Sequence, residues 1–95
     1  MPLSSPPRTT ADPASVSASA SSVQLFAENE AAVGRAVLND STATLYLKFG
    51  ETASTIDYTV KMGAGDYFEF PTPLYGGVVE GIWSSATGSA KVTEW

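Results

Sequence analysis

The chain has 95 residues, with five basic and ten acidic side chains, a formal net charge of −5, and neither cysteine nor histidine. Disulfides and thiolate chemistry are therefore excluded, and the commonest metal ligand and general base is missing. Because the acidic balance comes without a basic run, and no apolar run approaches the roughly 18 residues of a membrane span, we expect neither nucleic acid nor membrane as a partner.

The first 22 residues are dominated by proline, serine, threonine and alanine. Such a segment cannot bury enough apolar surface to offset the entropy lost on ordering it, so we predict an extended arm over 1–22 and a β-sandwich domain over 23–95. The alternating stretch VSASA (16–20) can add a strand to an exposed sheet edge of another chain. We expect the arm to contact another chain, either a neighbouring subunit or a partner protein, through Pro6, Pro7, Arg8, Val16, Ala18 and Ala20.

After residue 22, apolar residues alternate with polar ones, and glycine, proline and Asn-Asp turns interrupt the alternation at intervals of about ten residues. This rhythm is typical of an all-β fold, either a compact antiparallel sandwich or a jelly-roll-like barrel. Seven strands are predicted, over residues 23–27, 34–39, 43–49, 55–62, 66–70, 77–83 and 89–94. In the region 22–33, a short helix capped by Ser22 and ended by Gly34 is the alternative.

Alternation also predicts which side chains share one face of a strand. Over 43–49, one face carries Leu45, Leu47 and Phe49. Over 55–62, where the alternation is clearest, one face carries Ile56, Tyr58, Val60 and Met62. Pro71 and Pro73 lie between the predicted strands 66–70 and 77–83. Because proline has no N–H group to donate to a ladder, 71–73 is predicted to be a loop or a sheet edge.

From Leu25 onward the order of features resembles a group of small tailed-bacteriophage virion proteins. The resemblance is carried by NEAAVGRAVLNDSTATLYLKFG, then YTVKMGAGDYFEFP, then YGGVVEGIWSSATGSAKVTEW, and it does not include the arm. It implies a head decoration (cement) protein, or a similar head or tail accessory subunit, with a β-sandwich body. Such proteins are often trimeric and sit on the outer surface of the capsid, after synthesis in the host cytoplasm.

Four side chains of the domain are candidates for an interface with capsid or subunit. Trp83 and its neighbour Ile82 cannot both face the core, so Trp83 is either an exposed interface anchor or a plug at the end of the sandwich. Trp95 covers its own last strand or docks on a neighbour. Leu74 and Tyr75, on a stiff loop after Pro73, form a contact patch or fold over the core edge.

The acidic and amide side chains of the predicted loops lack the spacing of a calcium-binding loop and are expected to be solvated. They are Glu28, Asn29, Glu30, Asp40, Asp57 and Asp66. Arg35, at the start of a strand, is expected to form a surface pair with Glu28, Glu30 or Asp40, which adds at most about 1 kcal/mol.

No serine or threonine has a base positioned to activate it, and the glycine turns lack the spacing of a phosphate-binding loop, so we expect a non-enzymatic protein without cofactor or metal. The leading interpretation is a capsid decoration protein that forms a homotrimer, binds the major capsid protein or another virion protein, and stabilises the head. One alternative is a head-fibre base or host- or glycan-binding module, which a groove of Tyr67, Tyr75 and Trp83 would favour. The other is a tail or neck connector, which assembly into a larger ring would favour.

Overall fold

The fold is built from strands alone over residues 9–95, the part of the chain that the computed structural model describes. The eight strands are β1 (Asp12–Ser17), β2 (Val23–Phe26), β3 (Arg35–Asp40), β4 (Leu45–Phe49), β5 (Val60–Met62), β6 (Tyr67–Glu69), β7 (Val79–Trp83) and β8 (Ser89–Glu94). The strand β2 lies where a helix was the alternative, and no helix occurs among the described residues.

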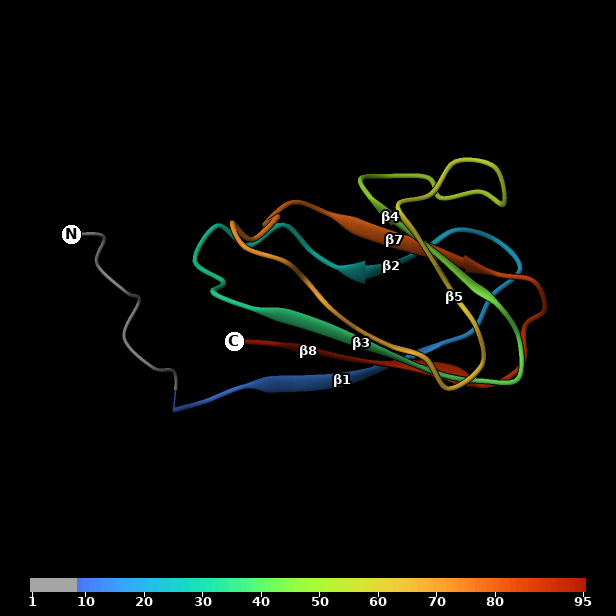
Figure 1. Cartoon of the computed structure of the whole chain (residues 1–95), viewed down its shortest axis with the longest axis horizontal. Helices are drawn as coiled ribbons and strands as arrows, with labels where there is room; N and C mark the ends of the chain where they lie inside the picture. Colours follow the sequence, from blue (N-terminus) through green and yellow to red (C-terminus); the bar gives the residue numbers. More distant parts are fainter. Residues whose placement is uncertain (1–8) are drawn as a thin grey trace.

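The strands form two four-stranded antiparallel sheets, with the orders β1-β8-β3-β6 and β2-β7-β4-β5 (Figure 1). In the pairs β1–β8, β2–β7, β3–β6 and β4–β5, the two strand numbers always add up to nine, as they do in one long hairpin that is rolled up. This winding is the jelly roll, in which eight strands form a double sheet. The predicted all-β sandwich is therefore confirmed, with eight strands instead of about seven.

The additional strand comes from the segment predicted to be an arm. β1 pairs with β8 of the same chain over its whole length, from Asp12 opposite Glu94 to Ser17 opposite Ser89. Main-chain hydrogen bonds make few demands on side chains, so a sequence of alanine, serine and proline forms a strand when a sheet edge is available to it. The sandwich therefore begins at residue 12 instead of 23, and the strand lies at 12–17 instead of 16–20.

The predicted strand over 55–62 is wrong in its first half, because the strand there comprises only Val60–Met62. Ser54 and Asp57 close a turn in front of it: the Ser54 hydroxyl oxygen accepts from the backbone N–H groups of Asp57 (2.9 Å) and Ile56 (3.3 Å). Such local side-chain bonds compete with strand pairing for the backbone. Ile56, which alternation placed in a strand, is 92% exposed at this turn.

The core lies between the two sheets, and most strands contribute alternate residues to it, whereas β2, with a register shift, contributes the consecutive Leu25 and Phe26. Leu45 and Leu47 are fully buried, as their shared face suggested, and Phe49 is half-buried beside them. The largest side chains that are fully buried are those of Trp83, Arg35, Leu45, Leu47, Met62, Val37, Val79 and Asn39. Two of these eight are polar, which directs attention to Arg35 and Asn39.

Candidate functional site

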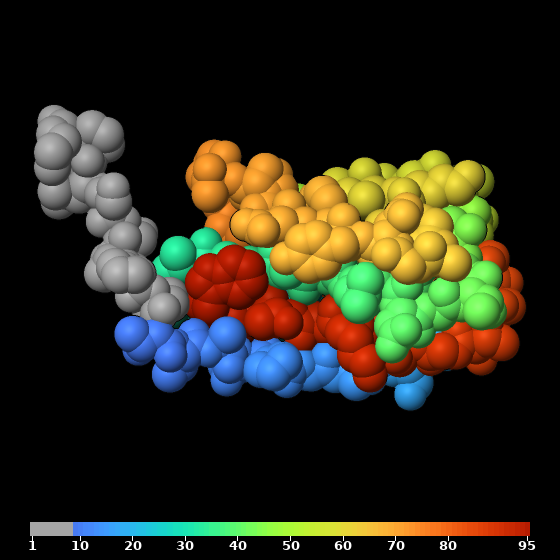
Figure 2. All heavy atoms as spheres, turned by 60° about the horizontal axis from the view of Figure 1, so that its bottom comes forward, coloured from blue at the N-terminus to red at the C-terminus, as the bar shows by residue number. Residues whose placement is uncertain are grey.

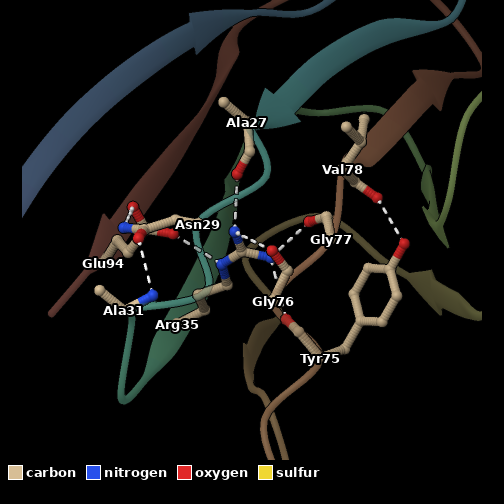
Figure 3. Close-up of polar contacts among 9 residues, drawn as sticks. All are labelled: Ala27, Asn29, Ala31, Arg35, Tyr75, Gly76, Gly77, Val78 and Glu94. Atoms are coloured by element: carbon tan, nitrogen blue, oxygen red, sulfur yellow. Dashed lines mark hydrogen bonds and ion pairs between the residues drawn. The ribbon is translucent and has the colours of Figure 1, made fainter.

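Arg35 occupies the end of the sandwich where β3 begins and β8 ends (Figure 3). Alternation along β3 places it on the same face as Val37, so it points between the sheets and is 0% exposed. Its guanidinium donates to Glu94 Oε2 (2.7 Å) and to the carbonyls of Gly77 (2.7 Å), Ala27 (2.7 Å), Tyr75 (2.9 Å) and Gly76 (3.4 Å). The expected surface pair with Glu28, Glu30 or Asp40 is therefore wrong: the arginine is buried, and its acid is Glu94, whose side chain is 21% exposed.

Glu94 and Asn29 extend this network to the loop that follows β2. Asn29 Nδ2 donates to the second carboxylate oxygen of Glu94 (3.1 Å), and the Asn29 backbone N–H donates to the Gly76 carbonyl (2.7 Å). A Cβ atom on Gly76 would lie 2.9 Å from the Asn29 carbonyl oxygen, so only glycine lets the two loops approach this closely. The loops at 27–32 and 75–77 are thus held together by Arg35 and its partners.

An open hollow of about 440 Å³ lies between these two loops. It is lined by Glu28, Glu30, Ala32, Leu74, Gly76 and Gly77. The two glutamates are exposed, whereas Leu74 and Ala32 are half-buried, so the hollow combines an apolar wall with an acidic rim. Such a surface suits an apolar side chain with a cation beside it. No group of three potential metal ligands occurs among residues 9–95.

Trp83 is a core residue, so of its two predicted roles the exposed interface anchor is wrong and the buried position holds. Its side chain is 1% exposed, and its indole N–H donates to Asn39 Oδ1 (3.1 Å). Val79, Gly81 and Trp83 are the inward residues of β7, whereas Ile82 lies on the outer face opposite Tyr46. The inward position at Gly81 is filled by leucines of the neighbouring strands: a Cβ there would lie 2.9 Å from Leu45 Cδ1.

Asn39, which the sequence places where the predicted strand 34–39 meets an Asn-Asp turn, is a polar residue of the core. Its Nδ2 group donates to the carbonyls of Ala43 (2.8 Å), Gly63 (3.0 Å) and Met62 (3.2 Å). Its Oδ1 atom accepts from the Ser41 hydroxyl (2.7 Å) as well as from Trp83. Asn39 therefore ties the turn after β3 and the end of β5 to the core. No buried side-chain nitrogen or oxygen of the described residues is left without a partner.

Leu74 and Tyr75 fold over the edge of the core. The Tyr75 ring stacks on Phe49, with centroids 4.9 Å apart, and its hydroxyl donates to the Val78 carbonyl (3.0 Å). Tyr67, by contrast, is 62% exposed on the edge strand β6. With Trp83 buried, Tyr75 stacked and Tyr67 exposed, the three aromatic residues do not share the surface groove that a glycan platform requires.

Trp95 packs on its own domain. Its backbone N–H donates to the Gly34 carbonyl (3.0 Å), and its carbonyl accepts from the N–H groups of Val33 (2.6 Å) and Gly34 (3.0 Å). Its ring occupies the space beside Gly34, where a Cβ atom would overlap the indole. Trp95 is thus an extension of the β8–β3 ladder.

The predicted contact residues of the arm fall into two groups. Val16 and Ala18 pack against the core of their own chain, whereas Ala20 is exposed. Pro6, Pro7 and Arg8 lie outside the described residues. Among the acidic residues, Asp57 pairs with Lys48 (2.6 Å) and Asp66 accepts from the Gly63 N–H (2.7 Å), so both stabilise turns.

In comparisons with known proteins, no family model, no curated protein and no solved structure matches this chain. The resemblance to phage virion proteins therefore rests on the sequence features alone. Residues 9–95 contain no helix of the length and apolarity that crossing a membrane requires.

Proposed function

We propose that this chain is a non-enzymatic structural protein of a tailed-phage virion. In this proposal it is a decoration protein on the outer surface of the capsid, where a homotrimer binds the lattice of the major capsid protein and stabilises the head. The jelly-roll winding supports the proposal because this architecture recurs in capsid domains. The net charge of −5 also suits an outer surface better than contact with packaged DNA.

The observation that carries the proposal is the free edge of β1. With six residues, β1 is the longest of the four strands at a sheet edge; β2 has four, and β5 and β6 have three each. Short edges resist pairing with other chains, whereas a long one is a template for it. In Figure 2 the blue N-terminal strand borders the molecule, with the red C-terminal strand along one side.

The register shows which backbone groups of β1 are open to a partner. The Ala18 N–H donates to the Gly88 carbonyl (2.9 Å), in continuation of the β1–β8 pairing. The backbone N–H and C=O groups of the even-numbered residues of β1 therefore point to β8, and those of the odd-numbered residues point outward. Pro13, which has no N–H, stands at an outward position, where it costs no bond to β8. Ser15 and Ser17 present outward N–H groups, and among residues 9–95 no strand pairs with this side.

A partner strand from the lattice that added to this edge would couple binding to assembly. A protein that binds the assembled shell, and not its dissociated subunits, stabilises the shell by an amount that increases with occupancy and affinity. Three copies in one trimer would bind multivalently, so that modest contacts at each edge give durable attachment.

The test is sedimentation of the purified protein with assembled phage heads that lack it, and with unassembled major capsid protein. We expect saturable binding to the heads alone, and an increase in the temperature at which the heads disrupt. Ser15→Pro removes an outward N–H group and keeps the bonds to β8, so we expect its affinity for heads to fall about tenfold or more. Lys91→Met, an exposed change on the neighbouring strand, is the matched control and should bind like the unaltered chain. Absence of binding to heads would contradict the proposal.

A further inference from the structure

We propose that the open edge of β1 binds one kind of strand, an antiparallel segment of another protein that reads apolar, polar, apolar, polar, cation from its amino to its carboxyl end. The inference rests on the proposed function, and it describes the segment of the lattice that binds there. Three rows of side chains run across the inner face of the sheet, from β3 through β8 to β1. Because residues that stand opposite each other on neighbouring strands point to the same face, an added strand extends each row by one side chain.

The backbone of β1 determines where such a strand can lie. Ser15 and Ser17 each turn an N–H and a C=O group outward, whereas Pro13 offers its C=O group alone. The edge ends after Ser17, because the Ser19 carbonyl accepts from the N–H of Trp83 (2.9 Å), which lies in the other sheet. The strand pairs of both sheets are antiparallel, the more stable arrangement per residue, so the added strand is expected to run antiparallel over 13–17.

Two of the three rows are apolar where they reach β1. Ala14 stands at the end of the row that contains Val37 and Val92, and Val16 stands opposite Ala90 in the next row. Burial decreases along these rows: Val37, Val92 and Ala90 are buried, whereas Val16 is half-buried and Ala14 is exposed. The methyl group of Ala14 leaves space beside it. Apolar side chains of an added strand, next to Ala14 and Val16, would cover this part of the inner face.

The third row ends in an acid. Arg35 stands opposite Glu94, and Glu94 stands opposite Asp12 at the start of β1. Glu94 is paired with Arg35, whereas Asp12 has no ion-pair partner among residues 9–95. Two acids side by side repel each other, so a lysine or arginine of an added strand, next to Asp12, would be stabilised there. Lys91 of β8 does not supply this charge, because it lies on the outer face with its ammonium group 3.1 Å from Ser15 Oγ.

A second copy of this chain fits the pattern only in part. β1 reads DPASVS and contains no cation, so it could extend the apolar rows but not the row that ends at Asp12. Residues 13–22 carry no charge of either sign, so no charged side chain protects the edge against strand addition. The edge is therefore open to a partner, and the acid at its start favours a different protein over a second copy.

The test titrates the full chain with short synthetic peptides and follows its backbone amide signals by NMR, which detects weak binding. The probe peptide alternates threonine and valine and carries one lysine two positions after its last valine. We expect saturable shifts of the outward amides of Ser15 and Ser17. A peptide with glutamate in place of the lysine should bind about fivefold more weakly. A peptide of the same composition in which the valines are adjacent should bind at least about tenfold more weakly, because it cannot place both on the inner face.

Variants of the chain separate the two parts of the pattern. Asp12→Asn, an exposed change, should abolish the preference for lysine over glutamate and leave the preference for alternation. Val16→Thr keeps the shape of the side chain and should weaken every alternating peptide about fivefold. Lys91→Met, on the outer face, is the control and should change none of these affinities.

Three outcomes would overturn the inference. They are the absence of shifts at Ser15 and Ser17 with any peptide, equal binding of the alternating and rearranged peptides, and shifts that depend on protein concentration alone, which would show that a second copy occupies the edge. Binding to heads, measured separately, distinguishes the two proposals. Heads that bind the chain without any peptide selectivity contradict this inference alone, whereas selective peptide binding without binding to heads contradicts the proposed function alone.

Discussion

Strands β1 and β3 are a matched pair with opposite properties. Each has six residues, and each pairs antiparallel with β8 over Ser89–Glu94, from opposite sides. β3 sends Arg35, Val37 and Asn39 into the core, all at 0% exposure. In β1 only Val16 is even half-buried. The difference shows that β3 is held by its buried side chains and belongs to the frame, by which we mean the strands that fill the core. β1 is held mainly by its backbone and remains available for contacts with other chains.

Replacement of Arg35 should have the largest effect on the frame. Arg35→Met fills similar space but takes away the donor to Glu94 Oε2 and to the carbonyls of Ala27, Tyr75 and Gly77, whereas the Gly76 carbonyl keeps the Asn29 N–H as a donor. Loss of the ion pair together with these buried hydrogen bonds should cost about 3–5 kcal/mol of unfolding free energy, measured by chemical denaturation. Lys91→Met removes the same charge from an exposed position on β8 and should change stability by less than about 0.5 kcal/mol. Equal losses in the two variants would contradict the assignment of Arg35 to the frame.

Replacement of Asn39 should have the next largest effect. Asn39→Leu is close in size, but it leaves the Trp83 indole N–H and the carbonyls of Ala43, Met62 and Gly63 without their buried partner. Unsatisfied buried polar groups cost about 1–3 kcal/mol each, and partial relaxation should leave a total of about 3 kcal/mol. Thermal denaturation with Ser41→Ala as the control checks this value, since Ser41 loses only its own contacts with Asn39 and Ala43. A loss no greater than that of the control would show that the core repacks around leucine.

The sequence predicts the class of fold, most of the strands and the face of β4, because period-two alternation and turn residues are local signals. The sequence also contains a signal for the buried network, in the positions of its polar residues along β3 and β8. Arg35 and Asn39 have the same parity as Val37, and Glu94 has the same parity as Val92, so a strand with Val37 inside carries its polar neighbours inside too.

Other features could not be predicted from local patterns. The pairing of Arg35 with Glu94 depends on the register between β3 and β8, which are far apart in the sequence. The alternating alanine and serine residues near β1 predict a strand at a sheet edge, but they do not indicate that this edge is β8 of the same chain. The turn at 54–57 defeats a clear alternation because Ser54 supplies a competing partner for the backbone.

Hydrogen exchange would sharpen the comparison further, with the smallest expected effect. In the free protein, the amides of Ala14 and Val16 that face β8 should exchange about 30-fold faster than those of β3, because β1 can open locally without disturbing the core. On assembled heads, the outward amides of Ser15 and Ser17 should become protected, whereas the exposed amide of Ala20 serves as an internal reference. If Ser15 and Ser17 exchange at the same rate in both states, the free edge of β1 is not the contact with the lattice. If β1 and β3 are equally protected in the free protein, β1 belongs to the frame as firmly as β3 does.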